Sequence, residues 1–211
     1  IRAAAELNMG AVAVYSEDDA DAFHVRLADE SLALQGTGAA AYLDADRIVA
    51  AARETGCWAV HPGYGFLAEN VAFAQKCEQA GIVFIGPAAD SLALFGDKAR
   101  AREKARECTI PLVPATSGPT SREEARQFFD SLGKHPAVMI KALAGGGGRG
   151  MRAVTEPSEL DAAYDICCSE AAAAFGNGDV YVERLIENAR HIEVQVIGDG
   201  TGAVSHLWER E

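Results

Sequence analysis

The stretch from Met139 to Val154 reads MIKALAGGGGRGMRAV: a lysine inside an apolar run precedes four consecutive glycines and a second apolar run. Gly145, Gly147 and Gly150 match the spacing G-x-G-x-x-G of dinucleotide-binding loops. Such a loop opens a helix, because the pyrophosphate sits on the helix N-terminus, whereas the MRAV that follows here is typical of a strand. The P-loop pattern G-x-x-x-x-G-K-S/T is also absent. The stretch therefore predicts two strands joined by a glycine-rich tip, and its short length and apolar flanks argue against a flexible linker.

The glycine-rich tip is suited to contact phosphate groups. Glycines let main-chain N–H groups approach phosphate oxygens closely, and Arg149 adds a positive charge. Lys141 lies four residues before Gly145, and since a buried ammonium without a partner is costly, this lysine is expected to face a cleft or a partner. We favour a flap that closes over phosphates, with Lys141 as a phosphate ligand. A purely structural glycine turn, and an edge lysine with its amine in water, stay open as alternatives.

The first half of the chain alternates strand and helix patterns up to about residue 96. Strands are expected at 11–15, 31–35, 57–63 and 82–87, and helices at 42–56 and 68–81. This alternation is typical of βαβ units, so we predict an α/β fold with a doubly wound parallel sheet. Asp44 is a candidate N-cap and Gly56 a candidate helix stop. Ligands of such sheets bind beyond the carboxyl ends of the strands, where HPGYGFLAEN (61–70) begins.

The second half is predicted to be mixed α+β. It opens with a charged helix near Asp97 and a connection at 109–121 that contains three prolines. The expected order is then helix 122–132, strand 137–143, the glycine-rich tip, strand 151–154, helix 157–175, strand 179–186 and two strands within 190–208 joined by a turn at 199–202. In this last pair Ile192, Val194 and Val196 alternate with polar residues, so one face is expected in the core.

Composition and charge exclude several classes of protein. The 211 residues carry a formal net charge of −12, from 31 acidic and 19 basic residues, without the basic stripe of a nucleic-acid binder. No apolar stretch approaches the roughly 18–20 residues of a membrane-spanning helix. Five cysteines without CxxC spacing indicate reduced, buried thiols in a cytosol-like compartment, and the histidines have no metal-ligand spacing with them. Both ends look cut, so the chain is expected to be a piece of a longer polypeptide.

Five motifs occur together in the order and spacing of one known family. They are HPGYGFLAEN (61–70), FIGP (84–87), FGDK (95–98), IKALAGGGGRGMR (140–152) and RHIEVQV (190–196). On these motifs essentially the whole chain resembles the biotin carboxylases, the ATP-grasp components that begin catalysis in acyl-CoA and pyruvate carboxylases. The resemblance implies a biotin carboxylase N-terminal domain at 1–96, without its first strand. It also implies the N-terminal part of an ATP-grasp domain at 97–211, with a lid subdomain at about 112–182.

The resemblance implies a reaction and a set of partners. MgATP, with Mg or Mn as the metal, would activate bicarbonate to carboxyphosphate, whose CO2 then carboxylates biotin on a carrier domain. Positive groups would spread the charge that develops in phosphoryl transfer, and the closed lid would keep water from carboxyphosphate. A carboxyltransferase domain or subunit and a homo-oligomer are expected for the full-length protein, in the cytoplasm or, in a eukaryote, the mitochondrial matrix. This piece alone is expected to be catalytically incomplete.

The resemblance also assigns residues of the site. The residues that would bind ATP are Lys98, Lys141, Gly147, Gly148, Glu183, Arg184, Leu185, Ile186 and His191. The rest of the lid would be Gly145, Gly146, Arg149 and Gly150. The residues that would line the active site are His61, Gly63, Tyr64, Gly65, Glu69 and Asn70. The two lysines would contact phosphates, and residues 183–186 would form the hinge that reads adenine. The chain is expected to hold no catalytic residue and no metal ligand, the metal carboxylates being expected beyond Glu211.

One departure and several alternatives accompany this assignment. Ala68 stands where the family usually has serine in GFLSEN, and a lost helix cap there would cost about 1 kcal/mol. From the residues alone, Lys98 is more often just a surface lysine. The break at Glu183–Arg184 can likewise be read as a strand end with a solvated ion pair. Another ATP-grasp ligase, such as a urea carboxylase or a carbamoyl-phosphate-synthetase relative, stays open. So does a non-catalytic nucleotide-binding or assembly module.

Overall fold

The computed structural model describes residues 1–144 and 150–211 and divides them into two compact units. The first unit is Ile1–Lys104 and the second Ala105–Glu211, and each is described by itself. Within the described ranges, no helix combines the length and the apolar character that crossing a membrane requires.

The first unit is built from short helices and strands. Its elements are α1 (Arg2–Glu6), β1 (Val12–Tyr15), η1 (Glu17–Asp19), α2 (Phe23–Leu27), β2 (Glu30–Ala33), α3 (Gly38–Ala41), α4 (Ala45–Glu54), β3 (Ala59–Val60), α5 (Val71–Gln79), β4 (Val83–Phe84), α6 (Ala89–Gly96) and α7 (Lys98–Glu107), whose last turn belongs to the second unit. Strand β1 pairs with β2 and β3 with β4, both in parallel, which confirms the predicted α/β class with parallel pairing. The described strands form two separate two-stranded sheets, and β3 and β4 have only two residues each.

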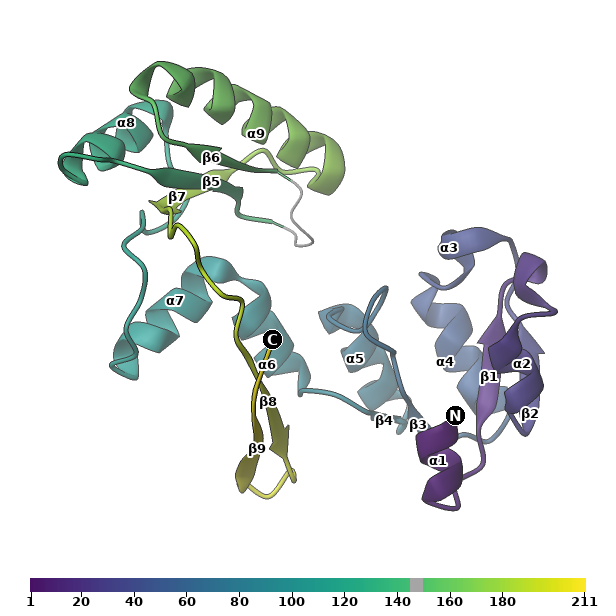
Figure 1. The fold of residues 1–211 in the computed structure, drawn as a ribbon. Coiled ribbons are helices and arrows are strands. Elements are labelled where there is room, and N and C mark those ends of the chain that lie inside the picture. Colours follow the sequence, from purple (N-terminus) through teal and green to yellow (C-terminus); the bar gives the residue numbers. More distant parts are fainter. Residues whose placement is uncertain (145–149) are drawn as a thin grey trace. The chain divides into compact units, whose positions relative to one another are not determined.

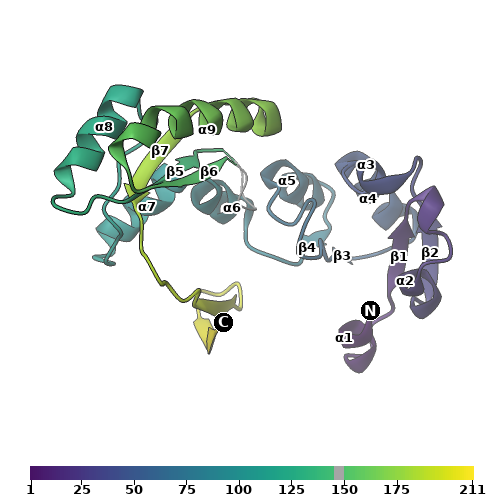
Figure 2. The same cartoon turned by 45° about the horizontal axis from the view of Figure 1, so that its top comes forward.

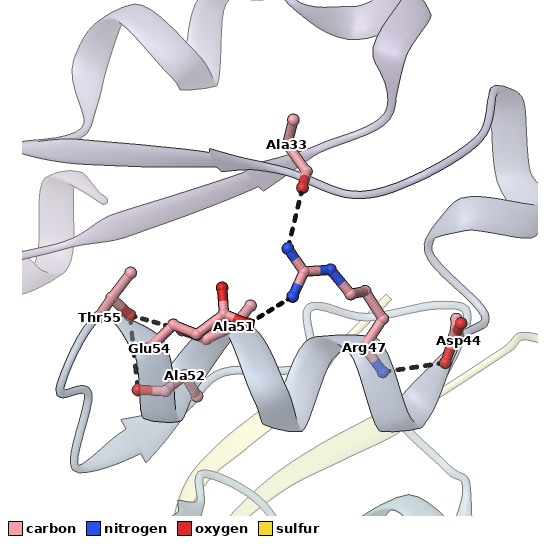
Figure 3. Close-up of polar contacts among 7 residues, drawn as sticks. All are labelled: Ala33, Asp44, Arg47, Ala51, Ala52, Glu54 and Thr55. Carbon is pink, nitrogen blue, oxygen red and sulfur yellow. Dashed lines mark hydrogen bonds and ion pairs between the residues drawn. The ribbon is translucent and has the colours of Figure 1, made fainter.

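Helix α4 begins and ends as its sequence predicts. Asp44 caps it, since Oδ1 accepts a hydrogen bond from the backbone N–H of Arg47 at 2.9 Å. Gly56 follows the helix with a left-handed φ of 66°. Figure 3 shows Arg47 extending from α4 to β2, where it donates to the Ala33 carbonyl at 3.5 Å and, within α4, to Glu54 at 2.8 Å. Arg47 thus ties α4 to the β1–β2 sheet.

The second unit contains a three-stranded antiparallel sheet with two helices on one face (Figures 1 and 2). Its elements are α8 (Arg122–Ser131), β5 (Val138–Ala142), β6 (Met151–Val154), η2 (Pro157–Glu159), α9 (Leu160–Phe175) and β7 (Val180–Arg184). The strand order is β6-β5-β7, so β5 is central. The core lies between this sheet and α8 and α9, and its largest side chains, each at most 1% exposed, include Phe129, Ile140, Leu160, Val180 and Val182.

The stretch 139–154, which contains the four consecutive glycines, lies in the hairpin of β5 and β6. The register pairs Val138 with Val154 and Lys141 with Met151, which confirms that the residues after the glycines form a strand. Gly150 has a φ of 65°, and a Cβ there would lie 3.1 Å from the Cβ of Ala142, so only glycine fits without strain. The tip itself, namely Gly145, Gly146, Gly147, Gly148 and Arg149, lies outside the described residues.

The last two strands form a separate antiparallel hairpin. Strand β8 (Glu193–Gly198) pairs with β9 (Val204–Arg210), and the turn is held by Asp199, which accepts from the N–H of Thr201 at 2.8 Å. The expected core face is wrong for the described structure, because Val194 and Val196 are 53% and 54% exposed. A two-stranded ribbon has no second layer of its own to cover that face.

The five cysteines are free thiols, as predicted, but they are not uniformly buried. Cys77 and Cys167 are buried, and burial raises the pKa of the Cys167 thiol to about 11. Cys57 and Cys168 are half-buried, whereas Cys108 is exposed just after α7. The prediction of burial is therefore wrong for Cys108, because this thiol follows a charged helix that has no buried residue.

Candidate functional site

The second unit brings two of the predicted residues together on one face of its sheet. Lys141 on β5 and Glu183 on β7 form an ion pair through Nζ and Oε1. The second carboxylate oxygen of Glu183 accepts a hydrogen bond from the hydroxyl of Tyr181 at 3.2 Å. Tyr181 lies opposite Lys141 in the β5–β7 register. The three side chains therefore form one connected group on adjacent strands.

This group lies on the face of the sheet that α8 and α9 do not cover. Side chains alternate along a strand, and Ile140 and Val182 point into the core beneath the two helices. Lys141 and Glu183 must point the other way, where their side chains are 24% and 16% exposed. The alternative of an edge lysine with its amine in water is wrong, because β5 is the central strand and the ammonium is paired.

The chain leaves β7 through the expected hinge residues. The N–H of Arg184 donates to the Pro114 carbonyl at 2.9 Å, and the N–H of Leu185 to the Ala137 carbonyl at 2.8 Å. Ile186 is 56% exposed, and none of the described residues accepts a hydrogen bond from its N–H. The backbone of these expected hinge residues is thus hydrogen-bonded at Arg184 and Leu185, whereas the Ile186 N–H has no acceptor among the described residues.

The outer edge of β7 is completed by a segment that sequence analysis read only as a connection. Thr116 donates its N–H to the Val182 carbonyl at 2.9 Å, and its Oγ1 accepts from the Val182 N–H at 3.0 Å. Thr120 donates to Thr116 Oγ1 at 2.6 Å and is only 5% exposed. Neither these threonines nor Tyr181 were predicted as site residues from the sequence. A threonine pair flanking Ser-Gly-Pro is the signal that could have indicated a side-chain-assisted turn.

The remaining ATP-binding candidates lie apart from the Lys141–Glu183 pair in the chain. Lys98 is the first residue of α7, where Asp97 Oδ1 accepts from the N–H groups of Ala99 and Arg100 at 2.9 and 3.1 Å. Its position suits an anion, since it adds to the positive end of the helix dipole. His191 lies between β7 and β8 with an 83% exposed side chain, and its Nε2 is 3.5 Å from Glu193.

The residues expected to line the active site form a turn between β3 and α5 in the first unit. His61 Nδ1 accepts from the N–H of Gly63 at 3.0 Å, which leaves Nε2 as the protonated nitrogen of the neutral ring. Gly63 needs its φ of 75°, and Tyr64 is fully exposed next to it. Gly65 and Glu69 are also exposed. The turn therefore presents polar and aromatic groups without any packing role for most of them.

Asn70 differs from its neighbours in this turn because it has a structural role. Its Oδ1 accepts from the N–H of Phe73 at 2.8 Å, which caps α5. The expectation that Ala68 has lost a helix cap is therefore wrong: Ala68 lies in the turn two residues before the cap, and the helix starts at Val71.

We expect Asn70→Ala to lower the free energy of unfolding of the first unit by about 1 kcal/mol, because α5 loses the acceptor for one of its first N–H groups. Ala68→Ser is the matched control and should change stability by a few tenths of a kcal/mol at most. Urea denaturation of both variants measures the difference. If Ala68→Ser raised the free energy of unfolding by more than Asn70→Ala lowered it, the helix cap would be at position 68 and not at Asn70.

The site holds no visible metal centre among the residues that the structure describes. In those ranges no group of three or more His, Cys, Asp or Glu side chains could hold a metal ion. A polar cavity of about 440 Å³ opens at the other end of β5, away from Lys141. It is lined by Lys134, His135, Pro136, Ala137, Thr155, Glu156, Pro157 and Glu187. None of its side chains belongs to the Lys141–Glu183 group.

Two family models match successive parts of the chain. The model described as Biotin carboxylase, N-terminal domain matches residues 1–92, and the model described as Carbamoyl-phosphate synthase L chain, ATP binding domain matches residues 97–211. The chain belongs to the biotin carboxylase family. The resemblance inferred from the five motifs is thereby confirmed.

Relatives in this family are much longer than the chain. Pyruvate carboxylase of Bacillus subtilis is 52% identical over all of this chain, which spans 18% of that protein. Biotin carboxylase 2, chloroplastic, of Populus trichocarpa is 49% identical, and the chain spans 40% of it. The chain thus covers less than half the length of either relative.

Solved structures of the family share the fold. A biotin carboxylase complex with β,γ-ATP from Campylobacter jejuni has a TM-score of 0.93 and 40% identity, and the match covers 99% of this chain and 47% of that one. A second structure is the biotin carboxylase domain dimer of 2-oxoglutarate carboxylase from Hydrogenobacter thermophilus, in complex with MgADP, ADP and bicarbonate. It has a TM-score of 0.90 and 46% identity, and the match covers 99% of this chain and 46% of that one. The biotin carboxylase fold is confirmed for this chain.

Proposed function

We propose that this chain carries part of the ATP site of a biotin carboxylase, in which MgATP activates bicarbonate to carboxyphosphate and biotin on a carrier domain is then carboxylated. The observation that carries the proposal is the Lys141–Glu183 pair on the uncovered face of the sheet, on strands that lead to the glycine-rich tip and to the hinge. A cation that is paired with a single carboxylate and keeps 24% of its side chain exposed is available to an incoming phosphate group.

Hydrogen bonding at the hinge supports adenine as the base. Adenine presents an amino donor and a ring-nitrogen acceptor side by side, so it needs a carbonyl and an N–H in the protein. The Ile186 N–H is open, whereas those of Arg184 and Leu185 are already used within the unit. We assign the acceptor role to the Arg184 carbonyl and the donor role to the Ile186 N–H.

The other site residues complete the proposal. We assign Lys141 and Lys98 to binding of the nucleotide phosphates, and the glycine-rich tip to covering those phosphates. His191 is assigned to the wall of the nucleotide site. The turn from His61 to Asn70 is assigned to the lining of the active site. The domains are proposed as 1–96 and 97–211, with a lid subdomain at 112–182. The metal carboxylates, the bicarbonate-holding residues and the biotin site are assigned to sequence beyond this chain.

Partners follow from the reaction. We assign Mg or Mn, bicarbonate and a biotin carrier domain to the full-length protein, together with a carboxyltransferase and self-association. The relatives described above support this, since they include a pyruvate carboxylase and a biotin carboxylase domain dimer in complex with MgADP and bicarbonate.

The test is bicarbonate-dependent ADP release by the full-length protein with and without free biotin. Stimulation by biotin is the expected result, because biotin consumes the carboxylated intermediate. ADP release that depends on bicarbonate but not on biotin would favour another ATP-grasp ligase. If ADP release did not depend on bicarbonate, the result would favour a non-catalytic nucleotide-binding or assembly module.

A further inference from the structure

A proline faces the hinge across the outer edge of β7. Segment 114–116 runs antiparallel to this edge, with Ala115 bridged to Glu183. Thr116 donates its N–H to Val182 and Arg184 donates its N–H to Pro114, both at 2.9 Å. These two bonds flank the bridge and place Pro114 directly opposite Arg184, where paired residues of an antiparallel ladder exchange two N–H···O bonds.

Only one of the two backbone hydrogen bonds expected between Pro114 and Arg184 can form. The Arg184 N–H reaches the Pro114 carbonyl, but the return bond needs an N–H at position 114, and proline has none. The N–H and C=O of one strand residue point to the same side, so the Arg184 carbonyl faces Pro114 and points away from β5. None of the described residues donates a hydrogen bond to it.

The next ladder position shows that the open carbonyl is specific to the proline. Opposite Val182, Thr116 satisfies both backbone groups, with its N–H for the carbonyl and its Oγ1 for the N–H. The edge of β7 is thus fully paired at Val182 and half paired at Arg184. A strand edge with one unpaired carbonyl is a ready acceptor for a ligand donor.

We propose that Pro114 is a specificity-determining positioning residue: by withholding an N–H, it keeps the Arg184 carbonyl available to the 6-amino group of adenine. This inference rests on the proposed function and extends it to a residue outside the hinge. Pro114 holds Arg184 in place through its own carbonyl while leaving the facing acceptor unused. Any other residue at position 114 would supply a competing donor.

The experiment combines a protein variant with a ligand variant in the full-length protein. Pro114→Ala restores an N–H, and Pro111→Ala is the control, since Pro111 is an exposed proline of the same connection. The nucleotides are ATP and purine riboside triphosphate, which lacks the 6-amino group. Steady-state release of the nucleoside diphosphate with bicarbonate measures kcat/KM for each combination.

For the wild type and Pro111→Ala, removal of the 6-amino group should lower kcat/KM by about five- to tenfold, the effect of one hydrogen bond. For Pro114→Ala the loss should shrink to about twofold or less, because kcat/KM for ATP falls while that for the analogue does not. The fall in kcat/KM should come from a higher KM for ATP, with kcat unchanged. Equal discrimination in all three proteins, or none in the wild type, overturns the proposal.

Hydrogen exchange of the backbone amide at position 114 of the Pro114→Ala variant tests the hydrogen bond separately. Slow exchange is expected, against fast exchange at position 111 of the control variant. Fast exchange at position 114 overturns the pairing whatever the kinetics are. A wild type without bicarbonate-dependent diphosphate release contradicts the proposed function instead, and with it the adenine role, while slow exchange would still support the pairing.

Discussion

Lys141→Ala is expected to lower kcat/KM for ATP by about 10- to 100-fold in the full-length protein, mostly through a higher KM. The variant removes a charge-assisted hydrogen bond to the phosphates, which is worth about 1.5–3 kcal/mol. It also leaves the Glu183 carboxylate, 16% exposed, without its cation on the face that receives the polyanion. Repulsion between that carboxylate and the phosphates acts in the same direction. Initial rates of ADP release across ATP concentrations measure the effect.

Two variants separate charge from folding in this experiment. Lys134→Ala removes an exposed lysine of the same unit, outside the Lys141–Glu183 group, and should leave KM unchanged. Adding Glu183→Gln to Lys141→Ala should recover part of the loss, because the uncompensated negative charge is gone. An ATP KM that Lys141→Ala leaves at the wild-type value would remove this lysine from the phosphate site.

Phe129→Ala is expected to lower the free energy of unfolding of the second unit by about 3–5 kcal/mol, the cost of an aromatic side chain removed from a packed core. Phe129 is 1% exposed and packs with Ile140, Leu160 and Val182 between α8, α9 and the sheet. This loss is a large fraction of the 5–15 kcal/mol that stabilises a typical domain. Hydrogen exchange of the β5 amides measures it locally, and they should exchange at least about a hundredfold faster.

Phe128→Ala is the matched control for this truncation. Phe128 is the neighbouring residue of α8 and packs against the same core, but it is only partly buried. Its replacement should therefore cost clearly less than that of Phe129. If the two variants lowered the protection of β5 equally, the inward face of α8 would be wrongly assigned.

Much of the local structure could be predicted because its causes lie close together in the chain. The cap of α4 at Asp44, the helix stop at Gly56 and the strand after the glycines each follow from a few neighbouring residues. The family followed from motifs that sit within such segments. The misplaced cap at Ala68 had the same origin, since two positions of the same turn, 68 and 70, are both close to the helix start, and the backbone geometry makes Asn70 the cap.

The exposed face of β8 could not be predicted from its alternation. Period-two patterning states that one face is apolar but not what covers it, and the described residues leave Val194 and Val196 half exposed. Exposure of Cys108 is a similar case, because burial depends on neighbours from elsewhere in the chain.

The candidate site likewise combines segments that the sequence indicates with contacts that only the tertiary structure shows. Lys141 beside the glycines was a candidate from residue types alone, whereas the hinge role of residues 183–186 was implied only by the resemblance to the family. That Lys141 meets Glu183, that Tyr181 holds the second oxygen of that carboxylate, and that Pro114 faces Arg184 are tertiary facts. They depend on the register between strands distant in the chain, and a slip of one residue would turn every one of these side chains to the opposite face. Packing of α8 and α9 against a single face selects that register, which is why only the folded chain decides it.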